Sequence, residues 1–121
     1  MASSAGFADY VCEQLEGLGR VQAKRMFGGF GLYLNSPMFA LIADDELYLK
    51  ADESNRETLL RLGGKPFKPF ENKPMMMPYI SVSADILDDA EALADLAKDA
   101  LRAAAAAKQP ARARPGTRRR V

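Results

Sequence analysis

Histidine is missing from this sequence, and cysteine occurs once, at Cys12. Histidine is the commonest general base and the commonest metal ligand in proteins. One thiol without imidazole does not make a structural zinc site, and a nucleophilic serine or cysteine would need activation by some other group. We therefore expect a protein that is not an enzyme, with no catalytic residue, no metal and no cofactor.

Long apolar runs are also missing. No segment reaches the about 18 consecutive apolar residues that a membrane-spanning helix requires. The stretch at residues 1–17 carries acids early and has no basic region, which argues against a signal peptide. A lone cysteine forms no internal disulfide and fits a reducing compartment. We expect a cytoplasmic protein with no membrane contact, and a half-buried, inert thiol at Cys12.

Acidic residues are absent from the C-terminal end. Residues 108–121 hold six of the 17 basic residues, which leaves 11 basic against 16 acidic residues in the rest of the chain, a net charge of −5 there. The composition predicts a folded domain over residues 1–107 and a disordered Arg-rich tail over 108–121. The tail is either a solvated extension or a weak, nonspecific contact for nucleic acid. The candidate DNA-contacting residues are Arg112, Arg114, Arg118, Arg119 and Arg120.

Periodicity in the first 107 residues predicts an α+β fold. An apolar stripe predicts a helix over about residues 5–17. Alternating or apolar runs with joints of two or three residues then predict consecutive antiparallel strands. The strands are expected at 21–27, 30–34, 38–43 and 46–51. The order α-β-β-β-β-α-β-α predicts an antiparallel sheet of about five strands, with the first and last helices covering one face.

The second half supplies the remaining elements. Asp52 is the expected N-cap of a short helix that ends at Gly63-Gly64. Residues 65–74, which contain three prolines, are expected to form a loop. A fifth strand follows at 75–82, where Pro78 indicates a sheet edge or a bulge. A capped helical turn begins at Ser83, and the last helix opens at Asp88 or Asp89.

The most informative motif is RMFGGFGLY at residues 25–33, where glycines lie among aromatic and aliphatic residues. Glycine adopts positive φ and permits close backbone approach, so the cluster predicts a corner or bulge between two strands. A phosphate-binding loop is the alternative, but such loops place their glycines before a helix. Here the strand-like FGLYL follows, which favours the structural corner.

The corner is also the candidate partner-binding site. Arg25 is expected either as an inward-facing, paired residue or as an exposed residue at the sheet edge, and the first is favoured because unpaired buried charge is costly. The methionines at 26, 38 and 75–77 either face the core or form an adaptable contact surface. The candidate residues are Lys24, Arg25, Met26, Phe27, Gly28, Gly29 and Gly31.

The motif continues into a longer pattern: KRMFGGFGLYLNSPMFALIADDELYLK, then PF at 66–67, then PMMMPYISVSADILDDAEALADLAKDAL. This pattern resembles the N-terminal domain of the TfoX/Sxy family over roughly residues 7–104. The resemblance implies a regulator of competence genes that contacts a protein partner in the transcription machinery, such as the cyclic-AMP receptor protein. Full-length competence regulators of the family carry a second helical domain, and this chain ends where that domain would begin. A homodimer is left open.

Overall fold

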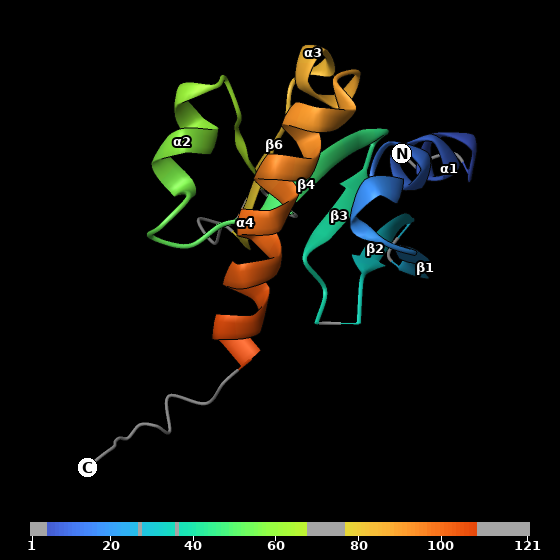
Figure 1. Cartoon of the computed structure of the whole chain (residues 1–121), viewed down its shortest axis with the longest axis horizontal. Helices are drawn as coiled ribbons and strands as arrows, with labels where there is room; N and C mark the ends of the chain where they lie inside the picture. Colours follow the sequence, from blue (N-terminus) through green and yellow to red (C-terminus); the bar gives the residue numbers. More distant parts are fainter. Residues whose placement is uncertain (1–4, 27, 36, 68–76, 109–121) are drawn as a thin grey trace.

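An antiparallel β-sheet forms the centre of the molecule (Figure 1). The structure, a computed structural model, describes residues 5–26, 28–35, 37–67 and 77–108. Within these residues the sheet has six strands in the order β1-β2-β3-β4-β6-β5. The strands are β1 (Gln22–Met26), β2 (Gly29–Tyr33), β3 (Ala40–Ala43), β4 (Glu46–Lys50), β5 (Pro66–Phe67) and β6 (Met77–Ser81). The predicted α+β class and the meander of the first four strands are confirmed, because short joints bring consecutive strands together.

Strand β5 corrects the prediction that residues 65–74 form only a loop. Pro66 pairs with Ile80 and Phe67 with Met77, with an irregular register between them. A proline fits here because β5 lies at the edge of the sheet, where a missing N–H breaks no ladder. The irregularity lies opposite Pro78, so the predicted bulge is confirmed, whereas β6 itself lies between β4 and β5 and is not an edge.

Two helices are shorter than predicted, the first at its C-terminal end and the second at its N-terminal end. The elements are α1 (Ala5–Gln14), a 3-10 turn η1 (Glu16–Leu18), α2 (Arg56–Arg61), α3 (Ala84–Leu87) and α4 (Ala90–Lys108). The expected N-cap at Asp52 is wrong: helix α2 begins after Asn55, and the Asp52 carboxylate accepts hydrogen bonds from Ser54 instead. Gly63, at φ +95°, ends the segment as predicted. Within the described residues, no helix is long and apolar enough to cross a membrane.

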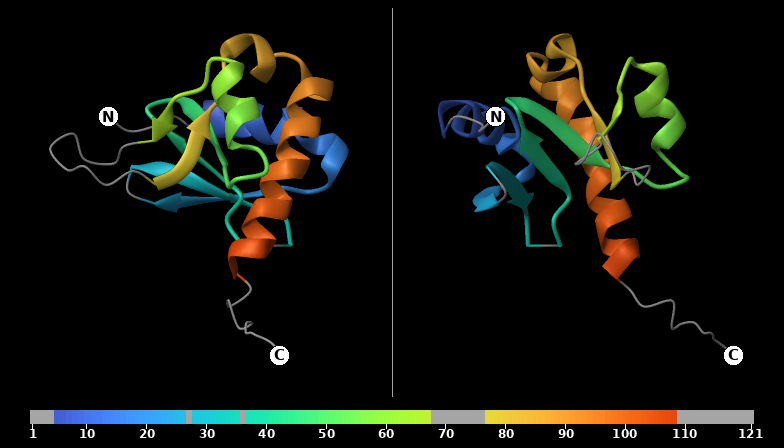
Figure 2. Two further views of the ribbon diagram at one scale, coloured as in Figure 1. Left: turned by 90° about the vertical axis from the view of Figure 1, so that its left-hand side faces the viewer. Right: turned by 180° about the vertical axis from the view of Figure 1, so that it is seen from behind.

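One face of the sheet is covered by α1 and α4, as predicted (Figure 2). The core between them contains Val11 and Leu15 of the N-terminal segment and Leu93 and Ala97 of α4, all fully buried. Helix α1 is fixed to the start of the C-terminal helical region by a hydrogen bond from Gln14 Nε2 to Leu87 O, 2.8 Å long. Small residues along α4 let this helix lie close to the strands.

The opposite face of the sheet carries a second row of apolar and aromatic side chains. Strand alternation places Tyr33, Leu41, Tyr48 and Tyr79 on this face, since their sequence neighbours belong to the core. The Tyr48 and Phe67 rings meet edge to face, with centroids 4.9 Å apart. Burial raises the pKa of Tyr48 and of Tyr79 to about 12.

Candidate functional site

The glycine motif forms a hairpin at one edge of the sheet. Strands β1 and β2 are antiparallel, with Met26 opposite Gly29, so a two-residue connection joins them. Gly28 in this connection has φ +80°, a conformation that costs other residues free energy. The predicted corner between strands is confirmed. Phe27, the other residue of the connection, lies outside the described residues.

Gly29 and Gly31 are strand residues whose backbones are approached closely by neighbours. A Cβ at Gly29 would lie 2.0 Å from the carbonyl oxygen of Ile42 in β3. A Cβ at Gly31 would lie 2.6 Å from Met38 Sδ and 2.9 Å from Met26 Sδ. The two glycines therefore serve close packing within the sheet, and neither has positive φ.

The two basic residues of β1 lie against aromatic rings. Lys24 Nζ is 5.0 Å from the centroid of the Tyr33 ring, and Arg25 Cζ is 5.0 Å from the centroid of the Phe30 ring. Both distances are within the range of cation–π attraction. Both basic residues are exposed. The favoured expectation of an inward, paired Arg25 is wrong, and the alternative of an edge residue is correct, because β1 has a neighbouring strand on one side only.

Charge separates this edge from the rest of the molecule. Between Glu16 and Asp44 the sequence has three basic residues, Arg20, Lys24 and Arg25, and no acidic residue. Within the described residues, no carboxylate forms an ion pair with Lys24 or Arg25. The β1–β2 hairpin is therefore a basic surface on a body with a net negative charge.

The methionines beside the hairpin are half-buried. Met26 and Met38 converge on the backbone of Gly31 from two sides. The sequence left open whether these methionines face the core or form a contact surface, and their half-buried positions lie between these two alternatives. Half-exposed methionine repacks easily against another molecule. The same prediction for Met75 and Met76 lies outside the described residues, as does the side chain of Met77.

The structure brings most of the predicted site together and adds two aromatic side chains that the prediction missed. Lys24, Arg25, Met26, Gly28, Gly29 and Gly31 all lie on the hairpin. The rings of Phe30 and Tyr33 under the two cations were missed. The length of the turn could have revealed the contact between Arg25 and Phe30. A two-residue connection fixes the register of the two strands, and this register places Arg25 opposite Phe30. The arginines of the predicted tail lie outside the described residues.

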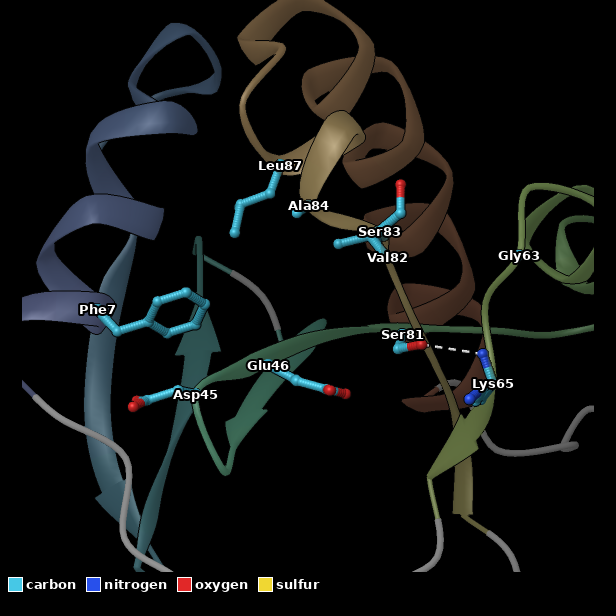
Figure 3. Close-up of a pocket in the computed structure, with 10 residues that line it drawn as sticks. All are labelled: Phe7, Asp45, Glu46, Gly63, Lys65, Ser81, Val82, Ser83, Ala84 and Leu87. Atoms are coloured by element: carbon cyan, nitrogen blue, oxygen red, sulfur yellow. Dashed lines mark hydrogen bonds between the residues drawn. The ribbon is translucent and has the colours of Figure 1, made fainter.

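A second candidate is a hollow of about 350 Å³ between α1, the β3–β4 turn and the start of α3 (Figure 3). Phe7, Asp45, Glu46 and Lys65 are among its lining residues, and the Lys65 N–H donates to Ser81 Oγ at 2.9 Å. Both acids are exposed. A small-molecule site encloses most of its ligand and directs a few polar groups into the cavity, whereas the carboxylates of this hollow lie exposed at an open surface.

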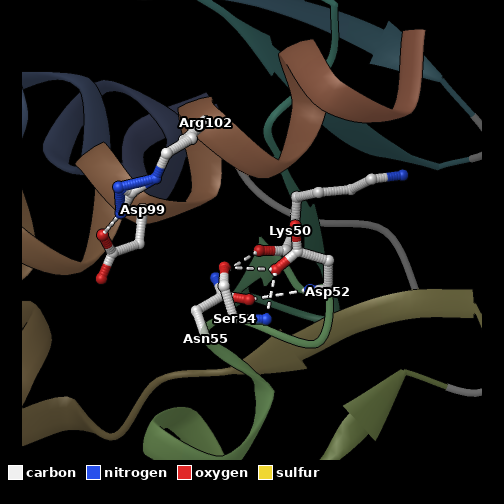
Figure 4. Close-up of polar contacts among 6 residues, drawn as sticks. All are labelled: Lys50, Asp52, Ser54, Asn55, Asp99 and Arg102. Atoms are coloured by element: carbon white, nitrogen blue, oxygen red, sulfur yellow. Dashed lines mark hydrogen bonds and ion pairs between the residues drawn. The ribbon is translucent and has the colours of Figure 1, made fainter. Parts of the chain in front are cut away.

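A third candidate is the polar network between β4 and α2 (Figure 4). The side chain of Asn55, only 3% exposed, accepts from the Asp52 N–H at 2.7 Å and donates to Lys50 O at 3.0 Å. The Ser54 hydroxyl and N–H donate to the Asp52 carboxylate, and these bonds hold the pKa of Asp52 below its usual value. Each of these bonds closes the turn, so the network is structural. The sequence prediction missed Asn55 because a lone asparagine after strand β4 is read as a surface residue.

The thiol of Cys12 is a weak candidate for a reactive group. Cys12 is half-buried, as predicted, and burial, followed by the nearby Asp9 charge, raises the pKa of its thiol. A raised pKa lowers the fraction of reactive thiolate. In the part of the chain that the structure describes, no group of three or more His, Cys, Asp or Glu residues could hold a metal ion.

The fold and the hairpin together define a small α+β domain that is shielded by helices on one face and presents a basic hairpin at one edge. The model of the TfoX N-terminal domain matches residues 13–104, so the chain belongs to this family. The sequence is also similar to a protein of Spirochaeta aurantia described as an uncharacterized 12.7 kDa protein in the trpE 5′ region. The two are 29% identical over 122 residues, which cover 97% of this chain and 96% of that protein.

Proposed function

We propose that this TfoX N-terminal domain is a non-catalytic, cytoplasmic regulatory module that binds another protein through its β1–β2 hairpin. The observation that supports this function most strongly is the exposure of β1, a five-residue edge strand with two basic side chains on aromatic rings. Arginine, methionine and aromatic residues are enriched at protein interfaces. The other edge of the sheet is a two-residue strand that begins with proline, which is a poor template for pairing.

The electrostatics favour a partner with an acidic contact surface. The hairpin is basic, whereas the first 107 residues together have a net charge of −5. A partner steered by this charge would approach the β1 edge and be repelled by the rest of the domain. Family membership supports a role in transcriptional regulation of competence genes, and it makes the cyclic-AMP receptor protein the first partner to test.

The test uses the full chain and two double variants with equal changes in charge. Lys24→Glu with Arg25→Glu reverses the hairpin charge. Arg61→Glu with Lys98→Glu makes the same change at two exposed positions on α2 and α4. Circular dichroism verifies that both variants fold. Partners are captured by cross-linking in the native cell, and the purified cyclic-AMP receptor protein is titrated separately.

The hairpin variant should capture at least about tenfold less partner, whereas the control variant captures it normally. A tenfold loss corresponds to about 1.4 kcal/mol, and changes at central interface residues commonly cost about 2 kcal/mol or more. Equal capture by both variants would show that the hairpin is not the contact surface. If the unmodified chain captures no specific partner, the proposed function is refuted.

The tail supports a second candidate, nonspecific association with nucleic acid. Its six basic residues have no acid among them, and each phosphate contact changes the slope of log K against log salt by about −0.9 on duplex DNA. A homodimer would double the number of tails and steepen this slope. The comparison is between the full chain and a version that ends at Ala107, titrated with duplex DNA at two salt concentrations. Equal binding of DNA by the full chain and the shortened version would rule out the tail as the nucleic-acid contact.

A further inference from the structure

We propose that the outer edge of β1 binds an extended, acidic peptide segment by strand addition, so that the partner becomes a seventh strand beside Gln22–Met26. This inference rests on the proposed function and specifies its binding mode and ligand chemistry. In strand addition, backbone hydrogen bonds supply affinity and the flanking side chains supply selectivity. Two features of β1 suit this binding mode: the direction of its backbone groups and the position of its two cations.

The direction of each backbone group follows from one hydrogen bond and the alternation of an antiparallel ladder. The Phe39 N–H donates to Leu32 O at 3.0 Å, so the backbone of Leu32 faces away from β1 and toward the chain entering β3. Backbone direction alternates along a strand, so Gly31 faces β1 and bonds with its partner Lys24. The backbone groups of Ala23 and Arg25, on either side of Lys24, consequently point outward.

No described element lies beyond this edge. Strand β1 is terminal in the sheet, and the residues from Gln22 to Arg25 are exposed. Within the described part of the chain, Ala23 and Arg25 have no backbone hydrogen bond to a segment outside the sheet. Two N–H donors and two carbonyl acceptors are therefore presented with the spacing that an extended peptide needs.

The cations decide the chemistry of the incoming strand. Lys24 and Arg25 are consecutive, so they lie on opposite faces of the sheet, next to Tyr33 and Phe30 respectively. Opposite charges on neighbouring strands stabilise pairing. An added strand with acidic residues at two adjacent positions would meet one cation on each face. This pattern differs from the alternation of acids that a one-faced basic surface would select.

The same charges disfavour pairing of this edge with a second copy of this chain. Pairing of β1 with β1 of another copy would bring the basic pairs of both strands together, because the strand holds no acid. Like charges on facing residues are destabilising. Charged edge strands commonly protect against aggregation in this way, and that protection does not extend to an acidic strand.

The probe is a library of random nine-residue peptides displayed on phage and selected against the full chain. The key variant is Ala23→Pro, which removes an outward N–H and places a ring at the edge. It leaves the bonds between β1 and β2 intact, because the Ala23 N–H does not take part in them. The matched control is Ala23→Thr, which keeps the N–H and suits a strand. Circular dichroism and thermal melting of both variants verify that the hairpin is intact.

Selected peptides should be enriched in adjacent Asp and Glu residues, bind the Ala23→Thr variant as the unmodified chain does, and bind the Ala23→Pro variant at least about tenfold more weakly. Hydrogen exchange by NMR needs no variant. Saturating peptide should slow exchange of the Ala23 and Arg25 amides at least about tenfold and leave the already bonded Lys24 amide unchanged.

Peptides without acidic enrichment, equal binding by the proline variant, or unprotected Ala23 and Arg25 amides would each overturn strand addition, as would a selection that yields no binder. Dimerisation of the unmodified chain in sedimentation, abolished by Ala23→Pro, would assign the edge to a second copy and would also overturn it. If a partner captured in cells depends on Lys24 and Arg25 but binds the Ala23→Pro variant normally, the proposed function stands and only the strand mode fails.

Discussion

Adding a single methyl group at Gly29 should destabilise the domain more than the same change at either neighbouring glycine. In the Gly29→Ala variant the new Cβ would lie 2.0 Å from the carbonyl oxygen of Ile42. Carbon and carbonyl oxygen normally approach to about 3.3 Å, so the shortfall is about 1.3 Å. No side-chain rotation relieves it, since both positions are fixed by the backbone. Strands β2 and β3 must separate locally.

The size of the effect follows from what that separation disrupts. Phe30 pairs with Ile42 directly beside the clash, and two ladder hydrogen bonds contribute about 1 kcal/mol each. Overpacking contributes about 1–3 kcal/mol more. We expect a loss of about 3 kcal/mol or more in the free energy of unfolding, which lowers Tm by at least about 12 °C for a domain of this size.

Two other glycines provide matched controls. Gly28→Ala places a methyl group in open space but at φ +80°, which costs about 1 kcal/mol. Gly31→Ala meets the sulfur atoms of Met26 and Met38, and these flexible side chains move aside at a cost of about 1 kcal/mol. Urea and thermal unfolding followed by circular dichroism measure all three. If Gly29→Ala is no less stable than Gly28→Ala, the close approach of β2 and β3 is not as described.

Three further predictions concern the polar groups. Asn55→Ala should destabilise by about 2–3 kcal/mol in urea unfolding, because it leaves the Lys50 carbonyl and the Asp52 N–H unpaired; a loss below about 0.5 kcal/mol would contradict this. The pKa of Asp52 is lowered on folding, so its contribution is present above the unfolded pKa and is lost as pH falls through the folded one. Asp52→Asn should therefore flatten the decline in Tm between neutral and acid pH, and an unchanged decline would refute the assignment. The pKa values of Tyr48 and Tyr79 are raised to about 12, so stability is lost as pH rises from about 10 through 12. Tyr79→Phe should remove one late step from the alkaline absorbance titration, and an unaltered titration would count against its burial.

Features with local causes were predictable from the sequence. The two-residue joints predicted the meander, and the acidic pair Asp44-Asp45 occupies one of them with φ values of +53° and +57°. The apolar stripe over residues 5–17 predicted the first helix, and Val11 and Leu15 from this stretch are buried in the core. The glycine motif predicted the hairpin.

Features that depend on distant segments were not predictable in the same way. Strand β5 consists of two residues, and only pairing with β6 makes it a strand. Asp52 suits an N-cap, but its carboxylate is engaged by Ser54, and the helix begins later. The position of Arg25 depended on whether another strand lay beside β1, and a sequence pattern does not contain that information.

The amino-acid sequence alone determined the class of fold, the consecutive pairing of β1 to β4, and the glycine hairpin with its basic residues. These follow from periodicity, turn length and composition, which act over a few residues. The tertiary structure decided which strands lie at the edges, which rings lie beneath Lys24 and Arg25, and that Gly29 is required by contact with β3 rather than by its φ. Edges and contacts are relations between segments far apart in the chain, so they exist only once the sheet has assembled.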